Sequence, residues 1–259
     1  MKYKKYNSSL PLVSIITPNF NGERYLEETI KSVINQEYKN IEYIIIDGKS
    51  NDSSKKIIKK YKKKINCFIS EKDNGIFHAV HKGIKKSKGK YIIWINSDDI
   101  LDKNAAKNIV KIFQNNPKVD WINGISGYIK NNIKFFFIPY IFPQKIILNG
   151  KAHKKFWGYI QQESVSFKRS LYIKSGGLNI KSNSGGDYFL WQKFAKYSKL
   201  NTFFIKIGYF RSHKDQFTKK KFYEDYTGHH SSKFNFNIIR LFVSLVSLPF
   251  IIIKTLINK

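Results

Sequence analysis

Cysteine and acidic residues are scarce in this chain of 259 residues. The single cysteine, Cys67, leaves no partner for an internal disulfide and too few thiolates for a cysteine-rich zinc site, which fits a reducing compartment. Only 18 acidic residues stand against 47 lysines and arginines, so the formal net charge is +29. That charge attracts polyanions: nucleic acid, an anionic membrane surface or phosphorylated substrates. Because the lysines are spread along the chain, the charge alone selects none of the three.

Several motifs are also missing. Neither Gly-x-x-x-x-Gly-Lys-[Ser/Thr] nor Gly-x-Gly-x-x-Gly follows the first apolar run, which argues against a P-loop NTPase and a dinucleotide oxidoreductase. The first ten residues are polar and basic without an apolar core, so we expect no secretory signal and a cytoplasmic protein.

Short apolar runs alternate with amphipathic stretches through the first half of the chain. The apolar runs predict strands at 12–17, 41–46, 65–69 and 91–95. Helical spacing predicts a helix over 23–35 with Asn21 as its N-cap, a lysine-rich helix capped by residues 50–52, a helix from Ile76 toward Gly89, and one capped by Asp102 that ends before Pro117. This alternation predicts an α/β fold with βαβ crossovers and a doubly wound, mainly parallel sheet.

Acidic residues follow three of these strands, namely Asp47, Asp73 and the pair Asp98-Asp99. A parallel sheet would bring all four carboxylates to one edge, where they need cations or hydrogen-bond donors to compensate them. Oxygen ligands suit Mg²⁺ or Mn²⁺, and those ions suit diphosphates. The pattern therefore predicts a metal-bridged nucleotide-diphosphate site, and the alternative is an aspartate-rich loop that caps the next helix.

Five motifs follow one another along the chain, at 13–21, 32–36, 44–52, 73–76 and 96–99. Together, in this order and spacing, they resemble those of family 2 glycosyltransferases with the GT-A fold. The resemblance implies inverting transfer of a sugar from a nucleotide-diphospho-sugar. It implies donor binding by Thr17, Pro18, Phe20, Asp47, Asp73 and Asp98.

The acidic signature of that family usually reads Asp-x-Asp or Asp-x-Asp-Asp and holds the metal ion and the donor ribose. Here Asn96 occupies its first position, as in a subgroup with Asn-Ser-Asp-Asp, so the resemblance implies a metal ion on Asp98 or Asp99. His78 also departs from the subgroup, because it stands where the usual Asp-x-Gly-Ile-Tyr-Asp-Ala motif has an acid.

Asp187 is the candidate catalytic base. Leu190, Trp191 and Phe194 recur at helical spacing, which places Asp187 in a first turn, where the helix dipole favours a carboxylate. The glycines before it, Gly185-Gly186, allow close approach to a substrate. The residues match the family's Gly-Asp-x-x-Leu-Trp pattern, which implies that Asp187 takes the proton from the acceptor hydroxyl. The alternative is a helix N-cap.

Three other stretches of the second half carry expectations. Residues 161–170 resemble the segment before the family's catalytic helix, and the basic stretch 150–159 suits an acceptor-facing loop. Strands are expected at 133–141 and 201–207. Residues 208–216 resemble the family's Phe-Arg-x-His-x-x-Gln stretch, which implies that Arg211 and His213 meet the diphosphate. Arg211 alone would suit a surface ion pair.

The C-terminal stretch from 238 to 257 is apolar but contains Arg240, Pro249 and Lys254. Its uncharged core, 241–253, is shorter than the roughly 20 residues that span a bilayer. We expect an interfacial or re-entrant helix held by the basic surface, and the alternatives are a helix buried on the catalytic domain or a partner helix.

Taken together, residues 1–228 are expected to form the GT-A domain, with 1–123 as the nucleotide-sugar half and 124–228 as the acceptor half. Residues 229–259 are expected to form a membrane-associating helical extension. The predicted enzyme transfers a sugar to a surface glycan or lipid-linked glycan at the cytoplasmic membrane face. The alternatives are a nucleotidyltransferase, whose Gly-rich loop is missing here, and a basic nucleic-acid-binding module. If the protein is a glycosyltransferase, no nucleic-acid partner is expected.

Overall fold

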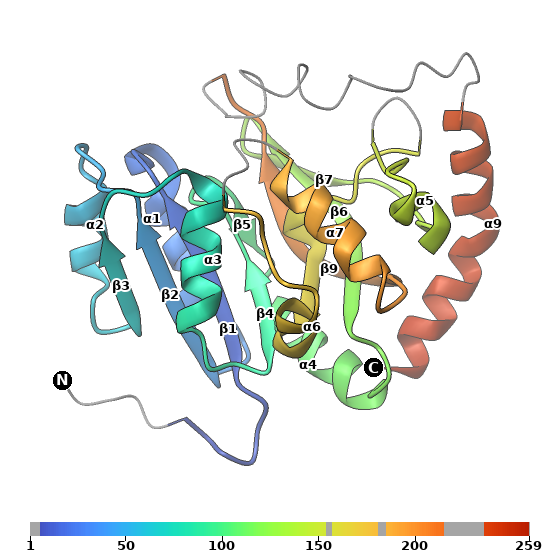
Figure 1. Cartoon of the computed structure of the whole chain (residues 1–259), viewed down its shortest axis with the longest axis horizontal. Coiled ribbons are helices and arrows are strands. Elements are labelled where there is room, and N and C mark those ends of the chain that lie inside the picture. Colours follow the sequence, from blue (N-terminus) through green and yellow to red (C-terminus); the bar gives the residue numbers. More distant parts are fainter. Residues whose placement is uncertain (1–5, 154–156, 181–184, 215–235, 259) are drawn as a thin grey trace.

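The computed structural model describes residues 6–153, 157–180, 185–214 and 236–258. In this part of the chain one curled sheet carries helices on both faces (Figure 1). Its strands are β1 (Val13–Asn19), β2 (Ile41–Asp47), β3 (Cys67–Ser70), β4 (Tyr91–Trp94), β5 (Ile100–Leu101), β6 (Trp121–Lys130), β7 (Ile133–Phe136), β8 (Val165–Lys168) and β9 (Asn201–Arg211). Its helices are α1 (Glu23–Ile34), α2 (Ser54–Lys60), α3 (Ile76–Lys86), α4 (Ala105–Asn115), α5 (Gln144–Leu148), η1 (Gln162–Ser164, 3₁₀), α6 (Arg169–Lys174), α7 (Gly186–Ala195) and α9 (Phe236–Ile257).

The sheet has the strand order β3-β2-β1-β4-β8-β6-β9-β5, with β7 paired to β6. The first four strands are parallel, which confirms the predicted βαβ half. Beyond β4 the sheet is mixed, because β8 runs antiparallel to both β4 and β6, while β9 is parallel to β6. β5 follows β4 closely along the chain and pairs with β9, so the sheet curls back toward its middle.

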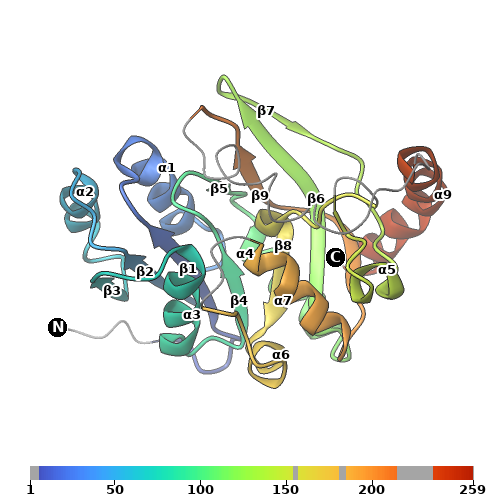
Figure 2. The same cartoon turned by 45° about the horizontal axis from the view of Figure 1, so that its top comes forward.

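Alternate strand residues feed two apolar cores, one on each face of the sheet. Ile15 and Ile93 pack with residues of α1, α2 and α4, whereas Ile16 and Trp94 pack with residues of α3, α5, α6 and α7. Figure 2 shows α3, α6 and α7 together on one side. Because these strands are covered on both faces, their sequences are apolar without alternation.

The predicted capping residues lie near the helix starts but act differently. Gly22, not Asn21, is the N-cap of α1, and the Asn21 side chain accepts a hydrogen bond from the backbone of Asn51, 3.0 Å away. The two loops after β1 and β2 therefore bind each other. Asp52 accepts hydrogen bonds from the backbone nitrogens of Ser54 and Glu23, and so serves the starts of both α2 and α1.

Two further boundaries differ from expectation. The strand predicted at 133–141 ends at Phe136, where the chain leaves its pairing with β6. The N-cap of α4 is Asn104, although Asp102 accepts a hydrogen bond from the Asn104 backbone nitrogen at 3.0 Å.

The C-terminal helix α9 packs on β9 at the edge of the molecule (Figure 1). Thr255 Oγ1 accepts a hydrogen bond from the Phe204 backbone nitrogen at 2.7 Å, and Lys254 donates to the Asn201 side chain at 2.8 Å. Among residues 241–258, the buried positions are Ser244, Ile251, Thr255 and Asn258. The large apolar side chains that are exposed there are Leu241, Phe242, Leu245, Val246, Phe250, Ile253, Leu256 and Ile257.

The outer face of α9 is thus more apolar than the face that packs on the domain. No helix in the described ranges has the length and apolar character needed to cross a membrane. Of the predicted extension, residues 229–235 and 259 lie outside the described residues.

Candidate active site

The loops after β1, β2 and β3 are held together by the buried carboxylate of Asp47. It accepts hydrogen bonds from the Asn19 side-chain nitrogen at 2.7 Å, the Ser70 hydroxyl at 2.6 Å, and both the backbone nitrogen and hydroxyl of Ser50. A buried carboxylate needs such donors, and here they come from the last residues of β1 and β3 and from the loop after β2. Asp47 therefore holds the ends of β1 and β3 and the loop after β2 in place relative to one another.

Of the other predicted donor-binding residues, Thr17 and Pro18 are buried while Phe20 is exposed. Thr17 Oγ1 lies 3.2 Å from the Tyr43 hydroxyl. Phe20 and Asp73 meet at Gly48, where an added Cβ would lie 3.2 Å from the Phe20 ring and 3.0 Å from an Asp73 oxygen. The structure thus brings an aromatic ring and a carboxylate together at an accessible edge.

His78 closes the turn that presents Asp73. Its Nδ1 accepts a hydrogen bond from the Asn74 backbone nitrogen at 3.1 Å, and Asp73 accepts one from Gly75 at 2.9 Å. The imidazole of His78 thus stabilises this turn, at the position where the resemblance implies an acid.

The adjacent aspartates Asp98 and Asp99 occupy different environments. The Asp98 side chain is 33% exposed, and its Oδ2 lies 2.9 Å from Nε2 of His213. Asp99 is only 1% exposed. Its oxygens accept hydrogen bonds from the Arg211 backbone nitrogen at 2.8 Å and from the Asn96 side chain at 3.1 Å. This geometry favours Asp98 over Asp99 as a metal ligand.

Arg211, the last residue of β9, connects that strand with α1 and with the loop that carries Asp98 and Asp99. Its guanidinium pairs with Glu28 at 2.6 Å, donates to the Asp98 carbonyl at 2.8 Å, and lies over the Tyr25 ring. The side chain is buried. The guanidinium is thus engaged within the protein, and its expected contact with the diphosphate stays a prediction.

Glu163, in η1, is a buried acid that the sequence analysis did not single out. It hydrogen-bonds with Asp99. Burial, together with the nearby charges of Asp98 and Glu163, raises the pKa of Asp99 well above its ordinary value. Burial also raises the pKa of Glu163 to about 7, and Asp98 and Asp187 add to that rise. The sequence signal that could have identified Glu163 is its position next to an otherwise uncharged, strand-forming stretch, Ser164 to Phe167.

Asp187 lies in the first turn of α7, as predicted from the helical spacing. Gly185 before it has φ +65°, a left-handed conformation that favours glycine. A Cβ on Gly186 would lie 2.6 Å from the Phe77 ring, so this glycine allows α7 to pack closely on α3. The expected approach of Gly185-Gly186 to a substrate stays a prediction. Ser184 lies outside the described residues.

Asp98 and His213 fit a divalent metal ion that a phosphorylated ligand helps to hold. A partly exposed carboxylate and an imidazole are two suitable donors. Within the described ranges no group of three or more His, Cys, Asp or Glu residues could hold a metal alone. Mg²⁺ commonly binds one or two carboxylates and completes its shell with substrate phosphates and water.

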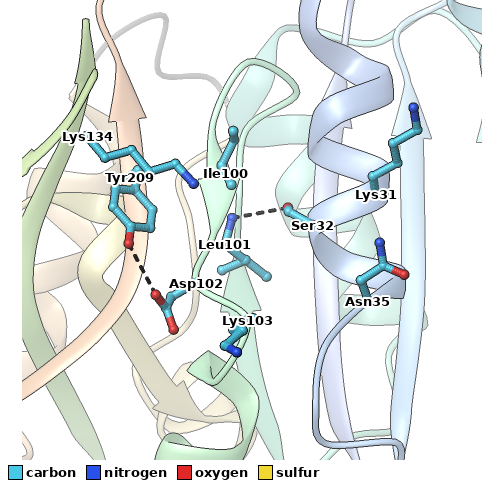
Figure 3. Close-up of a pocket in the computed structure, with 9 residues that line it drawn as sticks. All are labelled: Lys31, Ser32, Asn35, Ile100, Leu101, Asp102, Lys103, Lys134 and Tyr209. Atoms are coloured by element: carbon cyan, nitrogen blue, oxygen red, sulfur yellow. Dashed lines mark hydrogen bonds between the residues drawn. The ribbon is translucent and has the colours of Figure 1, made fainter. Parts of the chain in front are cut away.

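A separate pocket lies between α1, β5 and β9 (Figure 3). Tyr209 donates a hydrogen bond to Asp102 there, and Leu101 donates one to Ser32. None of the predicted catalytic, donor-binding or metal residues lines it. We therefore place the candidate site at Asp98, Glu163 and Asp187 instead.

Comparisons with known proteins agree with this fold and sequence pattern. The family model for glycosyl transferase family 2 matches residues 14–173. An uncharacterized glycosyltransferase of Rickettsia bellii is 31% identical over 229 residues, covering 85% of this chain and 32% of the relative. The putative teichuronic acid biosynthesis glycosyltransferase TuaG of Bacillus subtilis is 36% identical over 100 residues, covering 38% of this chain and 40% of TuaG.

Solved structures share the fold at low sequence identity. TarS of S. aureus in complex with UDP-GlcNAc has a TM-score of 0.64 at 16% identity, covering 91% of this chain and 67% of TarS. The mannosyltransferase PcManGT of Pyrobaculum calidifontis, in complex with GDP-Man and Mn²⁺, has a TM-score of 0.60 at 16% identity, covering 84% and 62%. The chain spans 32% to 62% of the length of five Rickettsia relatives. By its family match, the chain belongs to glycosyl transferase family 2.

Proposed function

We propose that the protein transfers a sugar from a nucleotide-diphospho-sugar to a hydroxyl of a surface glycan or lipid-linked glycan, with inversion at the anomeric carbon. One observation carries the proposal: in a chain that matches the glycosyl transferase family 2 model, the end of β9 contacts the pair Asp98-Asp99, with the Arg211 backbone nitrogen 2.8 Å from Asp99 and His213 2.9 Å from Asp98. Residues that are 112 and 115 positions apart in sequence thus meet at the two aspartates. The ligands named for TarS and PcManGT support a nucleotide-sugar donor.

The donor would bind along the edge formed by the loops after β1, β2 and β3. Phe20 and Asp73 present an aromatic face and a carboxylate there, suited to a nucleoside. Buried Thr17, Pro18 and Asp47 fix the loops that carry them. Asp98 and His213 would hold Mg²⁺ or Mn²⁺, which neutralises charge on the diphosphate leaving group.

Asp187 is the proposed general base. It takes the proton of the acceptor hydroxyl while that oxygen bonds to the anomeric carbon and the bond to the diphosphate breaks on the opposite face. Asp187 lies in the first turn of α7, where the helix dipole favours a negative charge. The Asp99–Glu163 pair positions the loop that carries Asp98.

A panel of nucleotide-sugars with and without Mn²⁺ tests the proposal. A ligand that binds only the folded protein stabilises it by about 2.7 kcal/mol at a hundred times its Kd, which a thermal melt detects. We expect at least one nucleotide-sugar to raise the Tm in a metal-dependent way. Salt-sensitive stabilisation by DNA or RNA, with no response to any nucleotide-sugar, would instead favour the nucleic-acid-binding module. A product with a new nucleotide-sugar bond would favour the nucleotidyltransferase.

We further propose that α9 holds the enzyme on the cytoplasmic face of the membrane without crossing it. The support is the exposed apolar face of α9 together with the net charge of +29. Apolar side chains gain free energy by entering the interface, and each nearby Lys or Arg adds about 1 kcal/mol on an anionic leaflet.

Replacing Phe250 and Ile257 with serine is expected to weaken binding to phosphatidylglycerol vesicles by at least about tenfold, because burying one such side chain is worth about 1.5–3 kcal/mol. Ile257 is 77% exposed, so the fold should be retained. Co-sedimentation at low and high salt is the measurement. Ile173→Ser on α6, where the side chain is 61% exposed, is the matched control. Equal vesicle binding by all three proteins would refute the role of α9.

A further inference from the structure

Four aromatic side chains lie side by side on the sheet where β7, β6 and β9 pair. We call them the aromatic row: Phe137, Phe135, Tyr128 and Phe210. In the strand register Tyr128 stands opposite Phe135 on one side and Phe210 on the other. Its ring centroid is 5.7 Å from that of Phe135, 5.8 Å from Phe210 and 5.0 Å from Phe137. The rings thus form one continuous surface across three strands.

The aromatic row adjoins Glu163. Gly208 stands two residues before Phe210 on β9, in the segment where the pairing of β9 with β6 is irregular. A Cβ on Gly208 would lie 3.1 Å from Cβ of Glu163. Gln161, just before η1, donates a hydrogen bond to the carbonyl of Gly127 beside Tyr128. The row therefore begins at the candidate active site.

The outer members of the row are open to solvent. Phe135 is 36% exposed and Phe137 is 47% exposed. The alternate residues of β7 behave differently: Phe136 contacts the Tyr209 ring on the other face, where Lys134 and Lys206 lie over the two rings. Exposed aromatic side chains that gather next to a site commonly mark a binding surface.

We propose that the aromatic row binds a sugar ring of the acceptor glycan. This inference rests on the proposed function. In that function a hydroxyl of the acceptor must reach Asp187, and the rest of the acceptor extends away from the candidate site at Asp98, Glu163 and Asp187. The C–H face of a pyranose is apolar and flat enough to stack on aromatic rings, while its hydroxyls stay in water. A second copy of this chain is a poor occupant of the surface, since each copy carries a net charge of +29.

The test uses the full chain and two readouts. Binding to an array of bacterial surface glycans needs no donor, and transfer assays give KM for acceptor and donor separately. We expect Phe135→Ala and Phe137→Ala each to lower glycan binding and raise the acceptor KM by about tenfold, with donor-induced Tm shifts unchanged. Phe135→Tyr, which keeps a ring, should restore binding. Phe68→Ala, at an exposed phenylalanine of β3 with 38% exposure, is the matched control.

Three results would overturn the inference. The first is that glycan binding and the acceptor KM are unchanged in both alanine variants, or that the parent protein binds no glycan on the array. The second is loss of vesicle binding alone, which would make the row a lipid contact. The third is a change in oligomeric state alone, which would make it a contact between copies. The donor-induced Tm shift of the parent reports on the proposed function separately, because donor binding does not involve the row.

Discussion

Replacing Asp187 with asparagine is expected to lower the rate of transfer by about 10² or more, the range for loss of a general base. Asparagine has nearly the same shape, so the start of α7 and its close packing on Phe77 through Gly186 should remain. Donor binding should be unaffected, because the proposed donor contacts lie on the loops after β1 to β4 and just after β9, not on α7. Single-turnover transfer measures the chemical step.

The matched control for this variant is Asp120→Asn. Asp120 is a partly exposed aspartate paired with Lys168, away from the candidate site. Its substitution should change the rate little, since exposed ion pairs contribute at most about 1 kcal/mol to stability. An Asp187→Asn protein that turns over near the parental rate would refute the assignment of the base.

Alanine at Asp98 and alanine at Asp99 are expected to fail in different ways. Asp98→Ala should fold normally, because its carboxylate is partly exposed, but should lose at least about 100-fold in metal-dependent donor affinity. Asp99→Ala leaves the buried Arg211 nitrogen, the Asn96 amide and Glu163 without their partner. Each buried polar group left unpaired costs about 1–3 kcal/mol, so the Tm should fall by several degrees.

Thermal melts with and without a nucleotide-sugar and Mn²⁺ measure both effects in one experiment. His213→Ala is the companion variant and should resemble Asp98→Ala. Unchanged donor affinity in Mn²⁺ for Asp98→Ala would contradict the metal assignment. A normal Tm and lost metal response in Asp99→Ala would return the metal to Asp99, one of the two positions that the sequence implied.

The first half of the fold could be predicted because its local signals agree with its packing. The runs at β1, β2 and β4 are apolar without alternation, as strands covered on both faces require, and each ends near the acid or amide that forms the site edge. The turn at Asp73 and the first turn of α7 were also readable from residue type and helical spacing.

The second half could be predicted only in part. The strand expected at 201–207 is confirmed as the first part of β9. By contrast, β5 has only two residues, and the four residues of β8 pair with strands far along the chain, so their places in the sheet could not be predicted from local pattern. The pairing of β6 with β9 contains two register irregularities. The contacts of Glu163 with Asp99 and of Arg211 with Glu28 follow from that pairing and not from sequence spacing.

Helix α9 shows a different limit of sequence reasoning. Its helical period separates one apolar face from one containing Ser244, Thr255 and Asn258, and the usual expectation places the apolar face inward. In the structure the polar face packs inward: Thr255 and Asn258 supply hydrogen-bond partners to strand β9 and to the end of α4, and Ile251 is the buried apolar residue among them. These hydrogen bonds join residues far apart along the chain, so the sequence pattern of α9 could not predict them.

The contacts of Arg211 with the loop that carries Asp98 and Asp99 also bear on the order in which parts of the fold form during synthesis. Arg211 lies 113 residues after Asp98 and 183 after Glu28, yet it contacts both. Residues 1–123 can emerge from a ribosome and pair β1 to β4 early, since those contacts are comparatively short in sequence separation. Before β9 is translated, Thr29 of α1 can already donate to the carbonyls of Ser97 and Asp99, but the contacts of Arg211 with Asp98 and Asp99 cannot yet form. On the proposed function, the residues that would hold a metal-bound donor are therefore brought together only when β9 joins the sheet.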